Sequence, residues 1–183
     1  MIRPIYLYGS DVLRQAAENV DPSRREEISA LVADLKETLA VADGCGLAAP
    51  QIGVDKRVLI VTGEGLDENY PYLKDFKRTI INPEVLEESE KTSTYSEGCL
   101  SVPGVYADVS RPSSIKLRYL DENLQVVEEV FDKFGCRMIQ HELDHLDGRL
   151  FVDRVAPIRK KLLTKKLLNI SRGKVSTSYK TKQ

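Results

Sequence analysis

The only two histidines of this chain, His141 and His145, lie four residues apart, and Glu142 directly follows the first of them. Because residues i and i+4 share one face of an α-helix, both imidazoles can point toward a single divalent cation. Glu142, one step round the helix, can then reach a water molecule beside the cation. This spacing predicts a hydrolytic metal site, in which the metal acidifies the water and the carboxylate takes its proton.

A hydrolytic metal site usually has three protein ligands and one open position for water, so a third ligand must come from elsewhere. No histidine follows His145. Cys99 is the better candidate, because Gly98 and Pro103 flank it in a compact, turn-like segment. Cys45, which lies between two glycines, is the alternative. Spacing by itself does not decide between the two cysteines.

The elements that position these residues follow from hydrophobic periodicity. Apolar residues at helical spacing predict three helices, over residues 25–39, 132–146 and 157–170. Short apolar or alternating runs predict strands, over residues 58–61, 79–82, 115–119 and 126–130. The second helix carries both histidines. The predicted fold is α+β, with mainly antiparallel small sheets packed around this central His-Glu-x-x-His helix and with a C-terminal helix.

Length and composition are those of an ordinary globular protein, with 183 residues, 42% of them hydrophobic and 30% charged. We expect one catalytic domain over residues 1–170 and a polar, basic, mobile tail over residues 171–183. No apolar run is long enough to span a bilayer and the first residues do not resemble a signal peptide, so we expect a cytoplasmic protein with no membrane contact. The odd number of cysteines favours reduced thiols, and Cys136 is expected to be a small buried side chain.

Positive charge is concentrated at the C-terminal end. Residues 154–183 contain ten Lys or Arg and no Asp or Glu, whereas the preceding residues carry a net charge of −11. A basic segment of this kind can bind RNA or an anionic membrane. It can equally be a solvated helix face followed by a frayed end.

Three segments of the chain resemble the motifs of the bacterial peptide deformylase family. They are residues 44–51 (GCGLAAPQ), 97–101 (EGCLS) and 140–148 (QHELDHLDG). The opening segment, residues 8–14, is also similar, and the likeness covers residues 4 to 155. Cys45 stands where the family often has an aliphatic residue.

The resemblance implies an enzyme that removes the formyl group from the N-terminal formylmethionine of newly synthesised proteins and releases formate. It implies three metal ligands, Cys99, His141 and His145. It also implies that the metal is typically Fe²⁺, which Ni²⁺, Co²⁺ or Zn²⁺ can replace. Ligand chemistry alone would favour zinc, because two imidazoles, one thiolate and a water are a familiar zinc set.

The resemblance also assigns the catalytic roles. Glu142 would take a proton from water and return it to the leaving amine. The side-chain amide of Gln51 and the backbone N–H of Leu100 would donate hydrogen bonds to the developing oxyanion. Glu97 and Asp144 are expected to orient ligands or bond nearby backbone.

The expected substrate site combines a glycine-rich backbone with an apolar pocket. Gly44 and Gly46 leave backbone groups accessible, so an extended peptide could pair with this segment as an added strand. Met138 and Phe134 precede His141 by about one and two helical turns and could line a pocket for methionine, although simple core packing would explain them equally well. The predicted substrate-binding residues are Gly44, Cys45, Gly46, Gly98, Arg111, Phe134, Arg137 and Met138.

Two other functions share parts of this pattern. A zinc peptidase would use the same helix to cut internal amide bonds, but the glycine motif and the Cys99 ligand argue against it. A catalytically silent module would need a fourth protein ligand, for which Cys45 is the spare thiol. For the deformylase interpretation, the expected partners are formylmethionine nascent peptides, with a weak ribosome contact through the basic C-terminal region; the oligomeric state is open.

Overall fold

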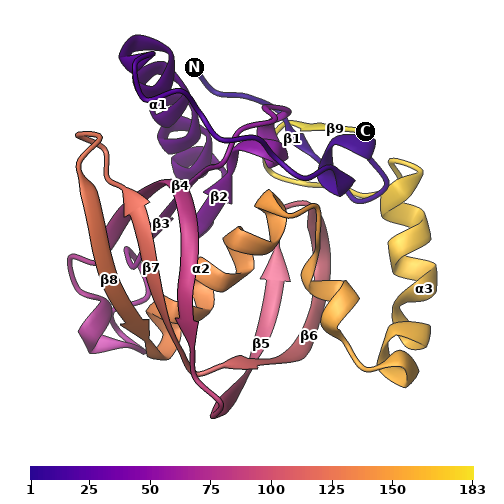
Figure 1. Cartoon of the computed structure of the whole chain (residues 1–183). Coiled ribbons are helices and arrows are strands. Elements are labelled where there is room, and N and C mark those ends of the chain that lie inside the picture. Colours follow the sequence, from indigo (N-terminus) through magenta and orange to yellow (C-terminus); the bar gives the residue numbers. More distant parts are fainter.

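The computed structural model describes all 183 residues (Figure 1). Its three α-helices are α1 (Arg25–Ala42), α2 (Lys133–Leu146) and α3 (Pro157–Ser171). Its strands are β1 (Ile5–Tyr6), β2 (Gly46–Ala48), β3 (Val58–Thr62), β4 (Lys77–Glu88), β5 (Thr92–Cys99), β6 (Val102–Pro112), β7 (Ser114–Leu120), β8 (Val126–Asp132) and β9 (Thr181–Lys182). The three predicted helices are confirmed. None of them has both the length and the apolar composition that a membrane span requires.

Five strands form the largest sheet, in the order β2-β3-β4-β7-β8, and every neighbouring pair in it is antiparallel. The four predicted strands all belong to this sheet. β5 and β6 form a separate antiparallel hairpin, and β1 and β9 form a short parallel pair near the two chain ends. The α+β class with mainly antiparallel small sheets is therefore confirmed.

The five-stranded sheet separates two hydrophobic layers. On one face Ile60 packs in a cluster with Leu39 of α1. On the other face Leu59 packs in a cluster with Ile139 of α2. Because successive strand residues point to opposite faces, a strand covered on both sides is apolar throughout, and this explains the unbroken apolar run at residues 58–61.

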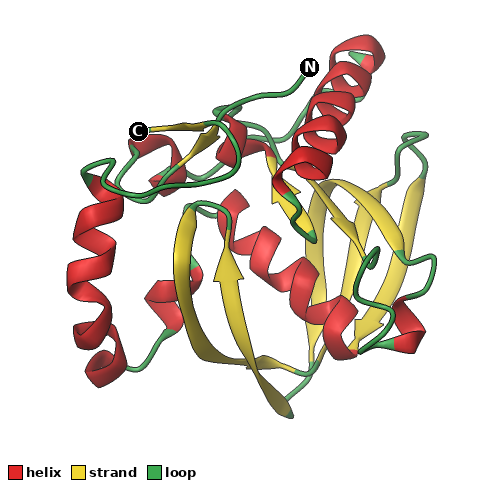
Figure 2. Ribbon diagram, turned by 180° about the vertical axis from the view of Figure 1, so that it is seen from behind, coloured by secondary structure: helices red, strands yellow, loops and turns green.

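Helix α2 lies between the five-stranded sheet and the β5–β6 hairpin, as views from opposite sides show (Figures 1 and 2). Most of the helix is buried, including the polar side chains of Arg137, Gln140, Glu142, Asp144 and His145. Buried polar groups need partners, so the elements around α2 must supply charged and hydrogen-bonding groups.

The sequence does not predict the β5–β6 hairpin. Cys99, expected in a turn-like segment, is the last residue of β5, and Leu100 and Ser101 form the turn that follows. The buried side chains of β6, among them Val105 and Val109, pack in one cluster with residues of α3. β5 is not recognisable as a strand from its sequence, because its side chains are mostly polar and lack the alternation of apolar and polar residues seen in β7.

The C-terminal segment 171–183, expected to be mobile, folds back onto the N-terminus. The backbone N–H groups of Ile5 and Leu7 donate to the carbonyl oxygens of Lys180 and Lys182, each at 2.9 Å. Strand pairing uses backbone groups that every residue carries, so a polar composition does not prevent it.

Candidate active site

Three side chains with metal-binding atoms converge beside α2. The donor atoms of Cys99, His141 and His145 all lie within 4.8 Å of one another. Both histidines come from α2, and the cysteine comes from the end of β5. Cys99 Sγ lies 3.4 Å from His145 Nε2. Two imidazoles and a thiolate fit a divalent transition metal and leave one position for water.

The other two cysteines lie outside this cluster. Burial raises the pKa of the Cys45 thiol to about 11, so that thiol stays protonated at neutral pH. Burial likewise raises the pKa of Cys136 to about 12, and this side chain lies in the core between α2 and the sheet, as expected. The tertiary structure therefore brings Cys99 to the histidines, a choice that spacing left open.

Glu97 holds the first histidine in place. Its Oε1 lies 2.8 Å from His141 Nδ1, which leaves His141 Nε2 free to face the cluster. Arg111 Nε and Arg137 Nη1 donate to Glu97 Oε2, at 2.8 and 2.7 Å. Although burial raises the pKa of Glu97, hydrogen bonds from Arg111 and His141 hold it well below its ordinary value. Glu97 is thus a carboxylate, and His141 is oriented by a fixed negative charge.

Arg111 does not lie where the substrate prediction placed it. Its side chain is 2% exposed and bridges two carboxylates, with Nη1 donating to Asp144 at 2.7 Å and Nε and Nη2 donating to Glu97. Arg154 donates to both oxygens of Asp144. Each nitrogen of the Arg111 fork faces a protein acceptor, so the residue supports α2 and β5 rather than a peptide.

The carboxyl group of Glu142 is buried beside the cluster and lacks a complete set of partners. Its Oε2 has no hydrogen-bond partner in the protein. Burial, with a smaller contribution from Glu97, raises the pKa of Glu142 to about 7. The other oxygen, Oε1, lies so close to Gly46 that a Cβ atom there would be 2.6 Å from it. A buried carboxyl group with a pKa near 7 can both take and return a proton at neutral pH.

Gln51 is held with its amide nitrogen toward the sulfur. The Ala48 N–H donates to Gln51 Oε1 at 2.9 Å, which directs Nε2 to Cys99 Sγ at 3.6 Å and to Ser101 Oγ at 3.1 Å. Leu100 lies in the turn between Cys99 and Ser101. The two predicted oxyanion donors, the Gln51 side chain and the Leu100 N–H, therefore come from separate segments of the chain, and both lie beside Cys99.

A cavity of about 720 Å³ opens onto this cluster. Seven of the predicted substrate-binding residues line it, namely Gly44, Cys45, Gly46, Gly98, Phe134, Arg137 and Met138. Arg111 does not. Arg137 reaches the cavity wall, but its guanidinium is committed to Glu97 and to the carbonyl oxygens of Val109 and Ser93. The glycine segment and α2 thus each contribute part of the cavity wall.

Both the sequence and the fold of this chain are similar to those of known proteins. The family model described as polypeptide deformylase matches residues 2–161. A peptide deformylase from Cytophaga hutchinsonii is 41% identical over 182 residues, which are 100% of this chain and 97% of that protein. The crystal structure of peptide deformylase from Thermus thermophilus has a TM-score of 0.83 and 32% identity, covering 94% of this chain and 99% of that one.

The chain belongs to the polypeptide deformylase family. It is accordingly a hydrolase. A class I type b peptide deformylase from Acinetobacter baumannii, with 36% identity and a TM-score of 0.78, is matched over 99% of its length but over only 84% of this chain.

The sequence missed several residues of the deformylase cavity. Tyr106 of β6 lines it, although the side chain is 71% exposed, and so do four consecutive tail residues, Ser176 to Tyr179. No local pattern marks them, because Tyr106 is placed by the pairing of β6 with β5, and the tail residues are held by the pairing of β9 with β1.

Phe134, which lines the cavity, belongs to an aromatic group. Its ring stacks on Tyr70, with centroids 4.6 Å apart and planes 4° apart, and meets Tyr95 edge-on at 5.3 Å. The two predicted roles of Phe134, cavity lining and packing, are therefore compatible in one side chain.

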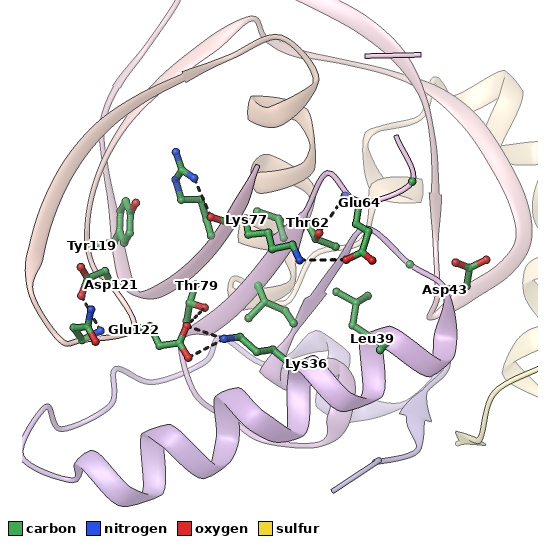
Figure 3. A pocket seen from close by; sticks show the side chains of 17 residues that line it. Lys36, Leu39, Asp43, Thr62, Glu64, Lys77, Thr79, Tyr119, Asp121 and Glu122 are labelled. Carbon is green, nitrogen blue, oxygen red and sulfur yellow. Dashed lines mark hydrogen bonds and ion pairs between the residues drawn. The ribbon is translucent and has the colours of Figure 1, made fainter. Parts of the chain in front are cut away.

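A second cavity, of about 690 Å³, lies between α1, strands β3 and β4, and the β7–β8 turn (Figure 3). Lys36 pairs with Glu122 at 2.7 Å, and Lys77 pairs with Glu64 at 3.2 Å. Its lysines thus already have acidic partners, and we assign no ligand to this cavity.

Proposed function

We propose that this protein removes the formyl group from the N-terminal formylmethionine of newly synthesised proteins and releases formate. One observation carries the proposal. The buried, incompletely partnered carboxyl group of Glu142 lies beside the convergent donor atoms of Cys99, His141 and His145, at a cavity whose wall includes open glycine backbone.

The residues fit a metal ion. Cys99, His141 and His145 would hold it, and the family resemblance favours Fe²⁺, with Zn²⁺, Ni²⁺ or Co²⁺ as replacements. When bound, such an ion supplies Lewis acidity that acidifies water and polarises the formyl oxygen. Burial and the nearby His141 hold the pKa of His145 well below its usual value, so His145 is available as a neutral ligand.

The protein's own residues would handle the proton and the developing charge. Glu142 would take a proton from water and pass it to the nitrogen of the leaving amine, a task that suits its pKa of about 7. Gln51 Nε2 and the Leu100 N–H would donate to the oxygen on which negative charge develops. The Ala48 N–H holds Gln51 Oε1, so Nε2 stays on the Cys99 side of the site, where it would exchange its bond to Cys99 Sγ or Ser101 Oγ for one to this oxygen.

Substrate selection would depend mainly on backbone. β2, which begins at Gly46, is an edge strand, so this strand and the residues Gly44 and Cys45 before it could pair with an extended peptide without reading its sequence. Met138, which lines the cavity one helical turn before His141, would contact the methionine side chain. A site that contacts only the methionine side chain and the backbone of the following residues suits many different nascent chains.

The basic C-terminal region would give a weak contact with ribosomal RNA, because Lys161, Lys165 and Lys166 are exposed on α3. Lys161→Glu with Lys165→Glu should then reduce co-sedimentation with ribosomes. Unchanged co-sedimentation would reject the contact. The three free cysteines support a reducing, cytoplasmic location for the enzyme.

The experiment that tests the proposal is anaerobic purification with metal analysis, followed by measurement of formate release from a formyl-Met peptide. The unaltered protein should release formate. Glu142→Gln, which keeps the shape of the side chain, should retain the metal and lose activity by a factor of about 10² to 10⁴. Glu122→Gln, a matched change at a residue that lines the second cavity and not the catalytic one, should leave activity unchanged.

Three results would count against the proposal or a part of it. Absence of formate release by the Fe²⁺-loaded protein would defeat the deformylase function. Normal release by Glu142→Gln would refute the role of Glu142 alone. Cleavage of internal amide bonds in an unformylated peptide would instead favour a peptidase.

A further inference from the structure

The C-terminal tail forms one wall of the catalytic cavity. Ser176, Thr177, Ser178 and Tyr179 line it, next to the turn that carries Leu100. The tail is held there because β9 pairs with β1 and because Gln183 Nε2 donates to the Ile170 carbonyl oxygen at 2.7 Å. The match to the family model ends at residue 161, so this wall lies outside the residues that the family model matches.

Tyr179 makes a direct contact between the tail and the turn, Leu100 and Ser101, that follows Cys99. Its hydroxyl donates to the Leu100 carbonyl oxygen at 2.7 Å. Its ring is half-buried against the apolar cluster that includes Leu39 and Leu100. Burial, with a smaller contribution from nearby Cys99, raises the pKa of Tyr179 to about 12, so the hydroxyl keeps its proton. Tyr179 is therefore a hydrogen-bond donor at neutral pH and well above it.

The peptide unit that Tyr179 binds also contacts the sulfur. The carbonyl of Leu100 and the N–H of Ser101 belong to one planar peptide group, whose two ends point in opposite directions. The Ser101 N–H donates to Cys99 Sγ at 3.4 Å. On the far side of Ser101, its carbonyl oxygen accepts from the Tyr8 N–H at 2.7 Å. Both chain ends thus hold the turn that follows Cys99.

We propose that Tyr179 is a positioning residue, whose hydroxyl holds the Leu100–Ser101 peptide so that the Ser101 N–H stays directed at the sulfur of Cys99. The inference rests on the proposed function, in which Cys99 is a metal ligand. Hydrogen bonds in a chain polarise one another, so the Tyr179 bond also strengthens the N–H···S bond beyond it. A donor to a ligating sulfur tunes the metal that the sulfur binds.

The hydrogen bond from Tyr179 to the Leu100 carbonyl also limits the movement of the predicted oxyanion donor, the Leu100 N–H. The N–H of Leu100 lies one peptide unit before the carbonyl that Tyr179 binds, and the turn is short. If the hydroxyl is removed, the Leu100–Ser101 peptide can rotate about its flanking bonds, and the Leu100 N–H can shift with it. The tail therefore supports both the ligand and the donor on this side of the cavity.

Tyr179→Phe tests the inference, because it removes the hydroxyl and keeps the ring. With Co²⁺ as the metal, the sulfur-to-cobalt charge-transfer band should move to lower energy, because a sulfur with a weaker hydrogen bond gives up its electrons more easily. With a formyl-Met peptide, kcat should fall about five-fold, the factor that one neutral hydrogen bond represents. KM should stay within about two-fold, since the cavity wall keeps its shape.

Tyr119→Phe is the matched control. Tyr119 is a buried tyrosine whose hydroxyl also makes one hydrogen bond, to Glu129 at 2.9 Å, and neither residue lines the catalytic cavity. It should lower the melting temperature to a comparable extent and leave the band and kcat unchanged.

The inference is overturned if the charge-transfer band of Tyr179→Phe matches that of the unaltered protein, even when kcat falls, because the tyrosine would then only stabilise the fold. If the unaltered protein releases no formate, the proposed function fails, and the cobalt spectrum by itself still decides whether Tyr179 acts on Cys99.

Discussion

Replacement of Gly46 by alanine would act directly on Glu142. The added Cβ atom would lie 2.6 Å from Glu142 Oε1 and 3.0 Å from Cγ and Cδ. Non-bonded heavy atoms settle about 3.5 Å apart, so the carboxyl group would have to move by about 1 Å. The Gly46 backbone would not itself be strained by the change, because it does not have a positive φ.

The expected loss of activity follows from that displacement. A misplacement of about 1 Å in a catalytic site can cost about 100-fold in rate, or roughly 2.7 kcal/mol of transition-state stabilisation. Crowding in the core costs about 1 to 3 kcal/mol in folding free energy. Gly46→Ala should therefore lower kcat/KM about 100-fold, while Cys99, His141 and His145 still bind one metal ion.

The assay is formate release, measured together with metal content and thermal unfolding. Gly135→Ala is a suitable control, because Gly135 lies in the same helix as Glu142 and a Cβ there would approach the Phe76 ring, at 3.3 Å, and not the carboxyl group. That variant should keep its activity. Gly46→Ala protein that carries its metal and releases formate at the native rate would show that the position of Glu142 against Gly46 does not matter.

Two further predictions concern buried and half-buried charge. Glu97→Gln should weaken metal binding about 10- to 100-fold and lower the free energy of unfolding of the metal-free protein by about 3 kcal/mol, because it removes the charge that orients His141 and faces two buried arginines. Chelator competition and urea unfolding measure these effects, and unchanged metal affinity would contradict the role of Glu97. Burial raises the pKa of Glu129, but hydrogen bonds from Arg78 and Tyr119 hold it below its ordinary value. A lowered pKa contributes stability above the unfolded-state value, and that contribution is lost as the pH falls. In urea unfolding, the native chain should have a higher free energy of unfolding than Glu129→Gln, and this difference should become smaller as the pH falls from about 5 to about 3. A difference that does not change with pH would exclude this linkage.

The helices and most of the large sheet could be predicted from sequence, because their patterns are local. The spacing of His141 and His145 requires only about 3.6 residues per turn, and the buried run at residues 58–61 requires only a strand covered on both faces. The β5–β6 hairpin could not be predicted, because the outer face of β5 is polar. The partner strand β6 becomes evident only from its hydrogen-bonded pairing with β5.

Contacts between distant segments explain why the prediction that Arg111 binds substrate was wrong. Arg111 was assigned to the substrate, yet it binds Asp144, 33 residues away, because α2 buries its acidic side chains against the hairpin. A guanidinium exposed to peptide and one that bridges two buried carboxylates look alike in a sequence. Only the positions of the carboxylates distinguish them.

The sequence by itself determined the two histidines, the glutamate that follows the first of them and the helix that presents them, since one helical turn sets their geometry. The tertiary structure decided which cysteine joins them, which acidic residue orients His141, and that Tyr179 reaches Leu100, 79 residues earlier in the chain. These contacts depend on how β5, α2 and the two chain ends pack together. No local pattern encodes that packing, because the free energy that selects it comes from burying all of these surfaces at once.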